Sequence, residues 1–347
     1  MHSIKVKNLN KSYDLKGLPV LKSFNFTFEK SKAYALMGPS GTGKSTLLNI
    51  LSGFDQQDSG EVQFGNSCEL MGRVKNVSCL KQDQQPAGDL SLFDQIAMAT
   101  GLEDKREAYE RTREMIDLFS LHYKDEYYSH QLSFGQKQRL MLACALAKKP
   151  SWLLLDEPFA HLDEMIRKDL ICELDLIRKK MNFGMITVTH NIEDVISWVD
   201  DVILLNWGQI CQTGGPVDLV EYPNDIFTAR YFGEANLISC EILEKINEKF
   251  YRVESYFGVQ EIKSYHSLGE RTKRALIFIR PYQVLLSPKE VEGFYRSRVM
   301  NVRLSKQGNL ITLSYEGKKI IAMDSLRHYK SDDIIYFSLP KVQLIST

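Results

Sequence analysis

The stretch Gly38-Pro39-Ser40-Gly41-Thr42-Gly43-Lys44-Ser45-Thr46 decides how the rest of the chain is interpreted. The apolar run 33–37 precedes it and the apolar-rich segment 47–51 follows, so the order is strand, loop, helix. The glycines let backbone N–H groups converge on a phosphate chain, and a helix beginning near Lys44 adds its positive dipole end. Lys44 supplies a charge for the outer phosphates and Ser45 a hydroxyl for magnesium. We therefore predict a nucleotide site; the alternative is a glycine turn that merely connects core elements.

Composition narrows the function classes. A chain of 347 residues suits two domains, and its 44 basic and 44 acidic residues form no long block of either sign. That balance argues against a nucleic-acid-binding arm. No apolar run approaches the roughly 18 residues of a membrane span, and residues 1–12 lack an apolar signal core. We expect a cytosolic protein.

The six cysteines are single and irregularly spaced, with no C-x-x-C pair. This spacing predicts reduced, mostly buried thiols rather than a metal site or a disulfide framework. They are Cys68, Cys79, Cys144, Cys172, Cys211 and Cys240.

Residues 1–235 have the pattern of a nucleotide-binding domain. Residues 4–9 and 19–28 predict antiparallel strands, and the charged segment 86–130 predicts a helical insertion that contains a helix over 103–121. Another helix is predicted after the insertion, over 136–149. Apolar runs at 152–155, 185–189 and 202–205 alternate with a helix that begins near Glu164 and is broken by Gly184. This alternation predicts an open parallel sheet with its ligand beyond the carboxyl edge.

The pattern changes after about Gly233. Short alternating runs at 299–304, 310–315, 319–323 and 334–339 are separated by turn signals, which predicts a small, barrel-like all-β domain. We place the domains at 1–235, with a helical subdomain at about 86–135, and at 236–347. No tandem repeat of the glycine loop occurs, so each chain carries one nucleotide module.

Polar residues at strand ends are candidates for the chemistry. Asp156 directly follows an apolar strand and can hold magnesium through water, and its neighbour Glu157 can take a proton from an attacking water. His190 ends a strand on the same edge, where an imidazole can donate to a γ-phosphate. Gln82 joins the strand 77–80 to the insertion and can contact the metal or the water. The alternatives are two surface acids and a core histidine.

A second anion-binding corner is predicted at Leu132-Ser133-Phe134-Gly135-Gln136, directly before a helix. One chain has one glycine loop and one such corner, far apart in sequence. The loop and the corner can act on the same nucleotide if two chains associate head to tail, so that each corner closes over the ATP held by the other chain.

These motifs together resemble the ATP-binding-cassette (ABC) ATPases over about two thirds of the chain. The resemblance implies an α/β P-loop NTPase cassette, a mostly parallel sheet with antiparallel β and α-helical subdomains, that binds ATP and Mg²⁺. In family order, the motifs are Tyr13 for the adenine-stacking aromatic, Gly38 to Thr46 for Walker A, Gln82 for the Q-loop, Leu132 to Gln136 for the signature, Leu153 to Glu157 for Walker B, Asp163 for the D-loop and His190 for the switch histidine. For Tyr13, packing against its own strand is the alternative.

Two residues depart from the family pattern. Phe134 replaces the commoner glycine of the signature, which weakens the case for a strong contact to the partner's ATP although Ser133 and Gly135 remain. The segment Ala160-His161-Leu162-Asp163 replaces the usual Ser-Ala-Leu-Asp.

The tail is similar to importer ATPases that end in OB-like or TOBE β-barrels and serve iron, polyamine, sulfate, molybdate or sugar uptake. The similarity rests on residues 231–237, 279–281 and 286–288, and it is greatest for the ferric-iron importers. Residues 47–60 are also similar to lipoprotein-releasing and macrolide exporters, which lack such a tail.

The resemblance implies an ATPase subunit that works as a head-to-tail homodimer on the inner face of the cell membrane, beneath permease subunits and, indirectly, a solute-binding protein. The Gln82 loop and the helical insertion are expected to receive the permease. A soluble ABC ATPase acting on DNA or ribosomes is the alternative, but such relatives usually carry two cassettes or a long coiled coil. A further hypothesis makes the β domain a ligand sensor that gates the ATPase.

Overall fold

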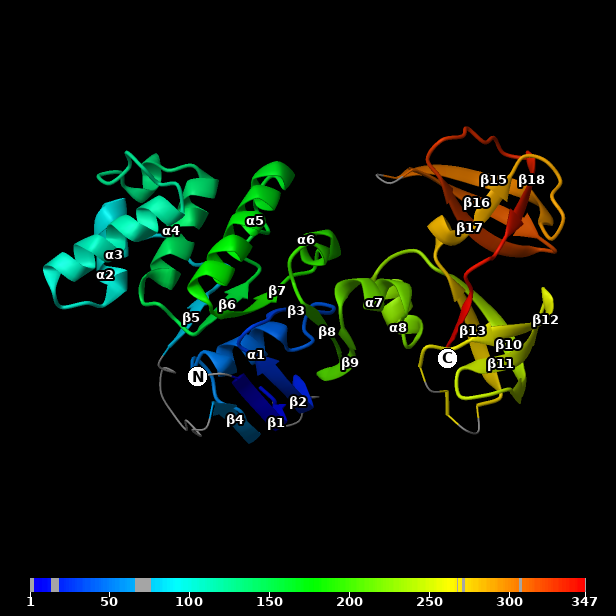
Figure 1. The fold of residues 1–347 in the computed structure, drawn as a ribbon, viewed down its shortest axis with the longest axis horizontal. Helices are drawn as coiled ribbons and strands as arrows, with labels where there is room; N and C mark the ends of the chain where they lie inside the picture. The colour runs from blue at the N-terminus through cyan, green and yellow to red at the C-terminus, as the bar shows by residue number, and fades with distance from the viewer. Residues whose placement is uncertain are drawn as a thin grey trace. The chain divides into compact units, whose positions relative to one another are not determined.

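The computed structural model describes residues 3–13, 19–65, 76–266, 268–269, 272–305 and 308–346. The chain divides into two compact units, Met1–Pro216 and Val217–Thr347 (Figure 1). Two short helices that the sequence did not predict, α7 (Pro216–Glu221) and α8 (Ile226–Tyr231), lie at and just after this division. The boundary predicted between residues 235 and 236 lies after α8, inside the second unit.

The main sheet of the first unit is the predicted, mostly parallel one. Its strands are β5 (Val77–Leu80), β6 (Trp152–Asp156), β7 (Gly184–Val188), β3 (Ala33–Met37), β8 (Asp201–Asn206) and β9 (Gln209–Gly214), in that spatial order. All neighbours are parallel except β8 and β9. Strands β3 and β7 are wholly buried, as strands covered on both faces must be. The antiparallel edge strand β9 was not predicted.

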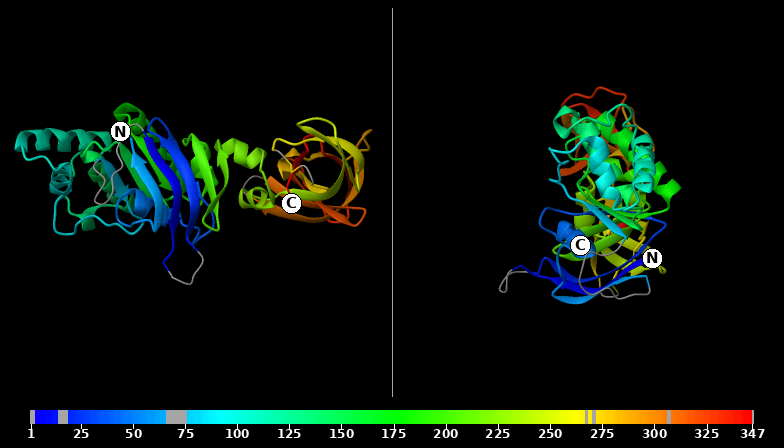
Figure 2. Two further views of the ribbon diagram at one scale, coloured as in Figure 1. Left: turned by 90° about the horizontal axis from the view of Figure 1, so that it is seen from below. Right: turned by 90° about the vertical axis from the view of Figure 1, so that its left-hand side faces the viewer.

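A smaller antiparallel sheet lies beside the main sheet. It has the order β2 (Leu21–Glu29), β1 (Ser3–Lys11), β4 (Ser59–Phe64), and Figure 2 shows β1 and β2 running side by side in blue. The predicted antiparallel pairing of residues 4–9 with 19–28 is confirmed. Side chains from both sheets, among them Phe28, Tyr34 and Trp152, form one buried core. The two sheets therefore hold the N-terminal residues in a fixed place relative to the glycine loop.

Three helices pack against one another: α2 (Leu92–Thr100) and α3 (Lys105–Leu118), which lie within the predicted insertion, and α4 (Phe134–Ala147), which follows it after the short 3-10 helix η1 (Ser129–Gln131). They lie together at one end of the first unit in Figure 1. The helix predicted over 103–121 is α3. The helix predicted over 136–149 begins earlier, at Phe134, because Ser133 is its N-cap.

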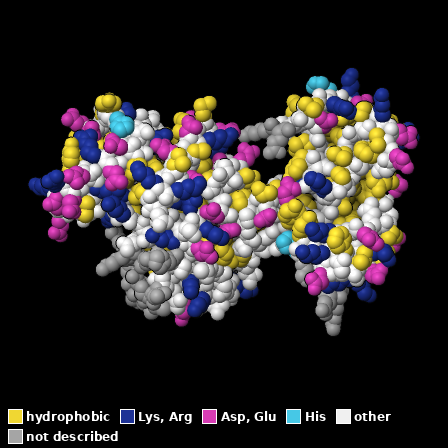
Figure 3. Space-filling view, viewed as in Figure 1, with side chains coloured by type: hydrophobic (Ala, Val, Ile, Leu, Met, Phe, Trp, Pro, Cys, Tyr) yellow, Lys and Arg dark blue, Asp and Glu magenta, His cyan; other side chains and the backbone are white. Residues whose placement is uncertain are grey.

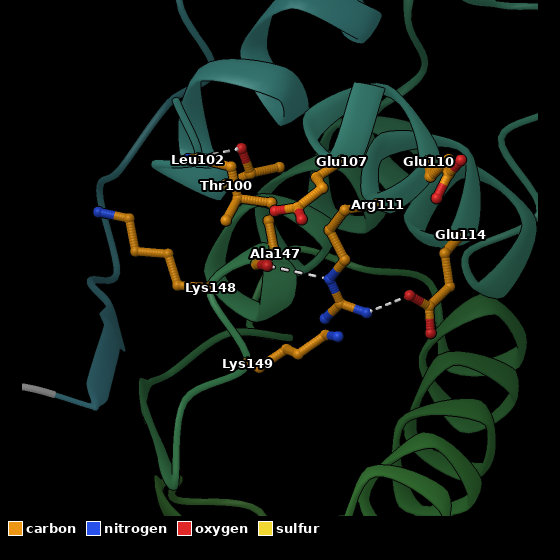
Figure 4. A pocket seen from close by; sticks show the side chains of 9 residues that line it. All are labelled: Thr100, Leu102, Glu107, Glu110, Arg111, Glu114, Ala147, Lys148 and Lys149. Carbon is orange, nitrogen blue, oxygen red and sulfur yellow. Dashed lines mark hydrogen bonds and ion pairs between the residues drawn. The ribbon is translucent and has the colours of Figure 1, made fainter. Parts of the chain in front are cut away.

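A pocket of about 440 Å³ lies between these helices, and the charged residue at its centre, Arg111, has a structural role (Figure 4). Arg111 of α3 is buried there and donates to the carbonyl oxygens of Leu146 and Ala147, at 2.7 and 3.0 Å. It also pairs with Glu114 at 2.5 Å. The last carbonyls of a helix lack partners within the helix. Arg111 therefore supplies hydrogen-bond donors to two carbonyl groups at the end of α4 and links α3 to that helix.

The remaining helices of the first unit are α1 (Lys44–Leu51), α5 (Glu164–Met181) and α6 (Ile192–Ile196). The prediction that Gly184 breaks α5 is wrong. Asn182 ends the helix in the left-handed conformation, at φ +54°, and donates its N–H to the Arg178 carbonyl. Gly184 begins β7, where an added Cβ would lie 2.6 Å from the Trp152 ring, so close packing is what requires glycine there.

The second unit confirms the predicted all-β tail. One antiparallel sheet has the order β12 (Gly258–Lys263), β11 (Phe250–Ser255), β10 (Asn236–Lys245), β13 (Arg274–Ile279), β19 (Gln343–Ile345), and the other the order β14 (Leu285–Ser287), β18 (Ile334–Ser338), β15 (Tyr295–Ser305), β16 (Gly308–Tyr315), β17 (Lys318–Asp324). A short 3-10 helix, η2 (Pro281–Gln283), connects β13 to β14. The two sheets enclose a shared core that includes Val253, Ile277 and Phe337.

Arg280, in the 279–281 stretch on which the resemblance of the tail rests, has a structural role. Its side chain is 2% exposed, and it donates to the carbonyl oxygens of Val220, Ala229, Gly233 and Glu234 at 2.7 to 3.2 Å. Burial lowers the pKa of Arg280 to about 10. The guanidinium thus fastens α7 and α8 to the β-sheets of the same unit.

The surface agrees with the balanced composition. Figure 3 shows basic and acidic side chains interspersed on the visible face of each unit. Among the described helices, none is both long and apolar enough to cross a membrane. The prediction that the cysteines are mostly buried is wrong: Cys240 is buried, Cys79, Cys144 and Cys211 are half-buried, and Cys172 is exposed on α5, while Cys68 lies outside the described residues.

Candidate functional site

The glycine loop joins β3 to α1, as predicted. Gly38, Gly41 and Gly43 have φ values of +144°, +79° and +93°, a region that side-chain-bearing residues rarely adopt. A Cβ at Gly38 would lie 2.2 Å from the Leu205 carbonyl oxygen, and one at Gly43 would lie 2.5 Å from the Val20 carbonyl oxygen. Both glycines are therefore required by the fold as well as by the loop's curvature.

Lys44 begins α1 and turns back over the loop. Its Nζ donates to the carbonyl oxygens of Gly38 and Pro39 at 2.8 and 2.7 Å. Burial lowers the pKa of Lys44, and the nearby carboxylates of Glu157 and Asp156 oppose that change. The Lys44 ammonium therefore interacts electrostatically with both acids while it is hydrogen-bonded to the loop.

Ser45 and Asp156 lie together at the end of β6. Burial raises the pKa of Asp156, and the nearby Ser45 hydroxyl opposes the rise. Oδ1 of Asp156 is buried without a hydrogen-bond partner among the described residues. An unsatisfied buried carboxylate oxygen beside a hydroxyl fits a hard divalent cation and its water ligands.

Glu157 and His190 meet at the same sheet edge. His190 Nδ1 lies 2.9 Å from Glu157 Oε2, and the side chains are 69% and 20% exposed, respectively. Glu157 has a φ of +47° and donates its backbone N–H to the Val188 carbonyl at the end of β7. Residues that follow two neighbouring parallel strands, β6 and β7, are thus brought together, and their carboxylate and imidazole can exchange a proton with a bound water.

Tyr13 lies near the start of α1 and is 63% exposed. Its hydroxyl donates to Asp55 Oδ2 at 2.6 Å and lies 3.4 Å from Thr46 Oγ1. Lys11 pairs with Asp55 at 2.8 Å and lies 5.1 Å from the centre of the Tyr13 ring. An aromatic ring that is anchored by its hydroxyl and open on its surface can stack on a base.

The other predicted residues form a second group. Ser133 caps α4 in a capping box with Gln136: the Gln136 N–H donates to Ser133 Oγ at 3.3 Å, and the Ser133 N–H donates to Gln136 Oε1 at 3.0 Å. Ser133 remains exposed. A Cβ at Gly135 would lie 3.3 Å from Ile166 Cγ2 on α5, close to the exposed N-cap Asp163.

The two departures from the family pattern contact each other. The rings of Phe134 and His161 lie 6.0 Å apart between centres and nearly perpendicular, at 85°. This edge-to-face contact links the start of α4 to the loop before α5. Nothing in the sequence connected these two positions.

Gln82 is exposed in the loop that joins β5 to α2, as its sequence position predicted. Other neighbours of the site were missed, namely Lys11, Asp55, Arg167 and Asp194. Their partners are distant in sequence, so no local pattern pointed to them.

Comparison with known proteins decides the family. The family described as ABC transporter matches residues 21–160. The spermidine/putrescine import ATP-binding protein PotA of Fusobacterium nucleatum is 34% identical over 83% of this chain and 77% of its own length. That of Thermotoga maritima is 32% identical over 92% and 87%. The sulfate/thiosulfate import ATP-binding protein CysA of Pseudomonas syringae is 30% identical over 91% and 89%.

The chain is an ABC-importer ATP-binding subunit. Solved structures agree with this ABC ATPase fold. The ATPase matches cbiO1 from Clostridium perfringens, part of the ABC transporter complex cbiONQ, with a TM-score of 0.58 and 27% identity over 63% of this chain and 90% of that one. It also matches the dimeric post-hydrolysis state of the ATP-binding cassette MJ0796 bound to ADP and Pi, with a TM-score of 0.56 and 26% identity over 61% and 98%.

Membership settles the reaction class: this ABC subunit is an ATPase that uses ATP with Mg²⁺. The residues present fit both. The glycine loop and Lys44 offer donors to phosphates, and Ser45 with the unsatisfied Asp156 Oδ1 offers oxygen ligands for the cation.

Proposed function

We propose that the chain drives a binding-protein-dependent importer from the inner face of the cell membrane, with a polyamine as the transported solute. The observation that carries this proposal is the similarity to two polyamine-import ATP-binding proteins over 83% and 92% of the chain. An alignment of that extent must include most of the second unit as well as the cassette.

In the proposed reaction, Glu157 accepts a proton from the attacking water, and His190 contacts the γ-phosphate. Their 2.9 Å separation supports this assignment, because a base and its orienting group must lie within hydrogen-bond reach. Lys44 binds the outer phosphates, Tyr13 stacks on the adenine, and Gln82 contacts the metal or the water. Ser45 and Asp156 hold Mg²⁺, which when bound neutralises phosphate charge.

The second group of residues, Ser133, Gly135, Gln136 and Asp163, is proposed to act on the ATP of a second copy. Their grouping at the start of α4 and α5, apart from the glycine loop in the sequence, and the exposure of Ser133 support this arrangement. A serine and glycine at a helix start present N–H and hydroxyl donors to an anion. A head-to-tail homodimer then holds two ATP molecules, and hydrolysis reopens it.

The permease subunits are proposed to dock on the Gln82 loop and the helices α2 to α4. A pocket of about 340 Å³ lies in this region, lined in part by Phe54, Gln84, Ala99 and Met141. A concavity lined by both apolar and polar side chains suits the insertion of a partner's amphipathic helix. For the second unit, its two packed antiparallel sheets support assignment as a TOBE-like domain.

Solute uptake in a strain lacking this gene tests the proposal. Polyamine uptake should be lost, restored by the wild-type gene and not restored by Glu157→Gln. Sulfate, because of the 30% identical relative, and ferric iron, because of the resemblance of the tail, are measured in parallel. Normal polyamine uptake together with loss of sulfate or iron uptake would reject the polyamine assignment, and unchanged uptake of all three would reject this importer role.

A further inference from the structure

Arg167 and Asp194 form an ion pair that no part of the nucleotide site explains. Arg167 Nε lies 2.8 Å from Asp194 Oδ1, and their side chains are only 17% and 8% exposed. Burial raises the pKa of Asp194, and Arg167 is the main group that opposes the rise. Removing charges from water is costly, so a pair this buried is a weak source of stability. A role other than stability is therefore needed to explain why this ion pair lies where it does.

The pair lies beside the reacting groups. Arg167 and Asp194 line the same small pocket, about 50 Å³, as Glu157 and His190. Asp194 belongs to α6, which begins two residues after His190, and Arg167 belongs to α5, which begins directly after Asp163. The ion pair thus joins the helix that follows one predicted site residue to the helix that follows another.

Helix α6 depends on such contacts for its position. It spans only Ile192–Ile196, and a helix of this length is not stable by itself in water. Val195 anchors it through a fully buried side chain, while Asp194 supplies its charged contact to α5. His190, just before this helix, is 69% exposed and so is poorly constrained by packing. The direction of its imidazole therefore depends on how α6 is held.

We propose that Arg167 and Asp194 are positioning residues for ATP hydrolysis. Their ion pair fixes α6 against α5 and so keeps the His190 imidazole within hydrogen-bond distance of the Glu157 carboxylate. The proposal rests on the role of His190 in hydrolysis given above.

A matched control lies farther along α5. Arg178 pairs with Asp175 at 2.9 Å, with side chains 6% and 13% exposed, so this pair is buried to a similar degree. It does not line the pocket that contains Glu157 and His190. Asp175→Asn therefore removes a comparable buried charge without disturbing the site.

The test is steady-state ATP hydrolysis by the full chain. Asp194→Asn and Arg167→Met should each lower kcat by about 10- to 100-fold, the scale of a small misplacement of catalytic groups. The KM for ATP should stay within about twofold, because the glycine loop is unchanged. Asp194→Glu, which keeps the charge, should recover much of the activity. Asp175→Asn should keep kcat even if its thermal midpoint falls as far as that of Asp194→Asn.

Combination with His190→Ala separates the possible failures. If Asp194 and Arg167 act through His190, substituting them should lower kcat no further in a His190→Ala chain. Additive losses of kcat would therefore overturn the proposal. Equal kcat values for Asp194→Asn and Asp175→Asn would also overturn it. Should Asp194→Asn not fold, Arg167→Met decides in the same way. Normal turnover by His190→Ala would instead reject the role of His190, and with it this inference.

Discussion

At the scale of single residues, Glu157 combines a strained backbone with a functional contact. Its φ of +47° lies in the left-handed region, which costs a side-chain-bearing residue of order 1 kcal/mol or more. The hydrogen bond from its N–H to the Val188 carbonyl keeps it there and directs its carboxylate toward His190. The conformation therefore exchanges some stability for the position of one carboxylate.

Replacing Glu157 by Gln should remove the base but keep the shape. We expect kcat to fall by about 10²- to 10⁴-fold, the usual contribution of general base catalysis. ATP affinity, measured by titration calorimetry, should be unchanged because Lys44 and the glycine loop remain. Glu193→Gln, the same change at an exposed acid on α6, serves as the control. Wild-type turnover by Glu157→Gln would contradict the assignment.

At the scale of helices and strands, local patterns were enough where one segment carries its own signal. The loop 38–46, the buried strand Trp152–Asp156 and the helix Glu164–Met181 were all readable because periodicity and turn chemistry act within a few residues. The Tyr13–Asp55 and Arg167–Asp194 contacts could not be predicted from the sequence, because each joins segments that only the fold brings together. Gly184 was misread for the same reason: the Trp152 ring that fills its space comes from another strand.

The attachment of α7 and α8 to the β-sheets of the second unit gives a prediction at this scale. Arg280→Met would leave the carbonyl oxygens of Val220, Ala229 and Gly233 without this donor. We expect a loss of roughly 2–4 kcal/mol in the free energy of unfolding of that unit, since buried unsatisfied acceptors are costly. Arg298→Met, at an exposed position of the same unit, should have little effect.

Two optical signals can assign that loss. All three tryptophans, Trp152, Trp198 and Trp207, belong to the first unit, so tryptophan fluorescence follows its unfolding. Circular dichroism follows both units. We expect the circular dichroism transition of Arg280→Met to move to a lower denaturant concentration, while the fluorescence transition stays where it is. An Arg280→Met chain as stable as wild type would show that this clamp is not needed.

At the scale of the whole molecule, each chain carries one glycine loop and one group around Ser133. We propose that these two parts meet only between chains, so that ATP itself joins two copies. Such coupling needs a ligand that binds the closed dimer better than the separate chains. Hydrolysis removes that ligand and can then reopen the dimer for the next transport cycle.

The most direct test is the molecular mass of the Glu157→Gln chain in solution, measured by light scattering with ATP and Mg²⁺. The mass should double with ATP and return to that of one chain with ADP. Adding Ser133→Arg, which places a bulky side chain at the proposed contact, should abolish the dimer, whereas Ser31→Arg in the turn between β2 and β3 should not. A single-chain mass with ATP, or a dimer indifferent to Ser133→Arg, would contradict the claim.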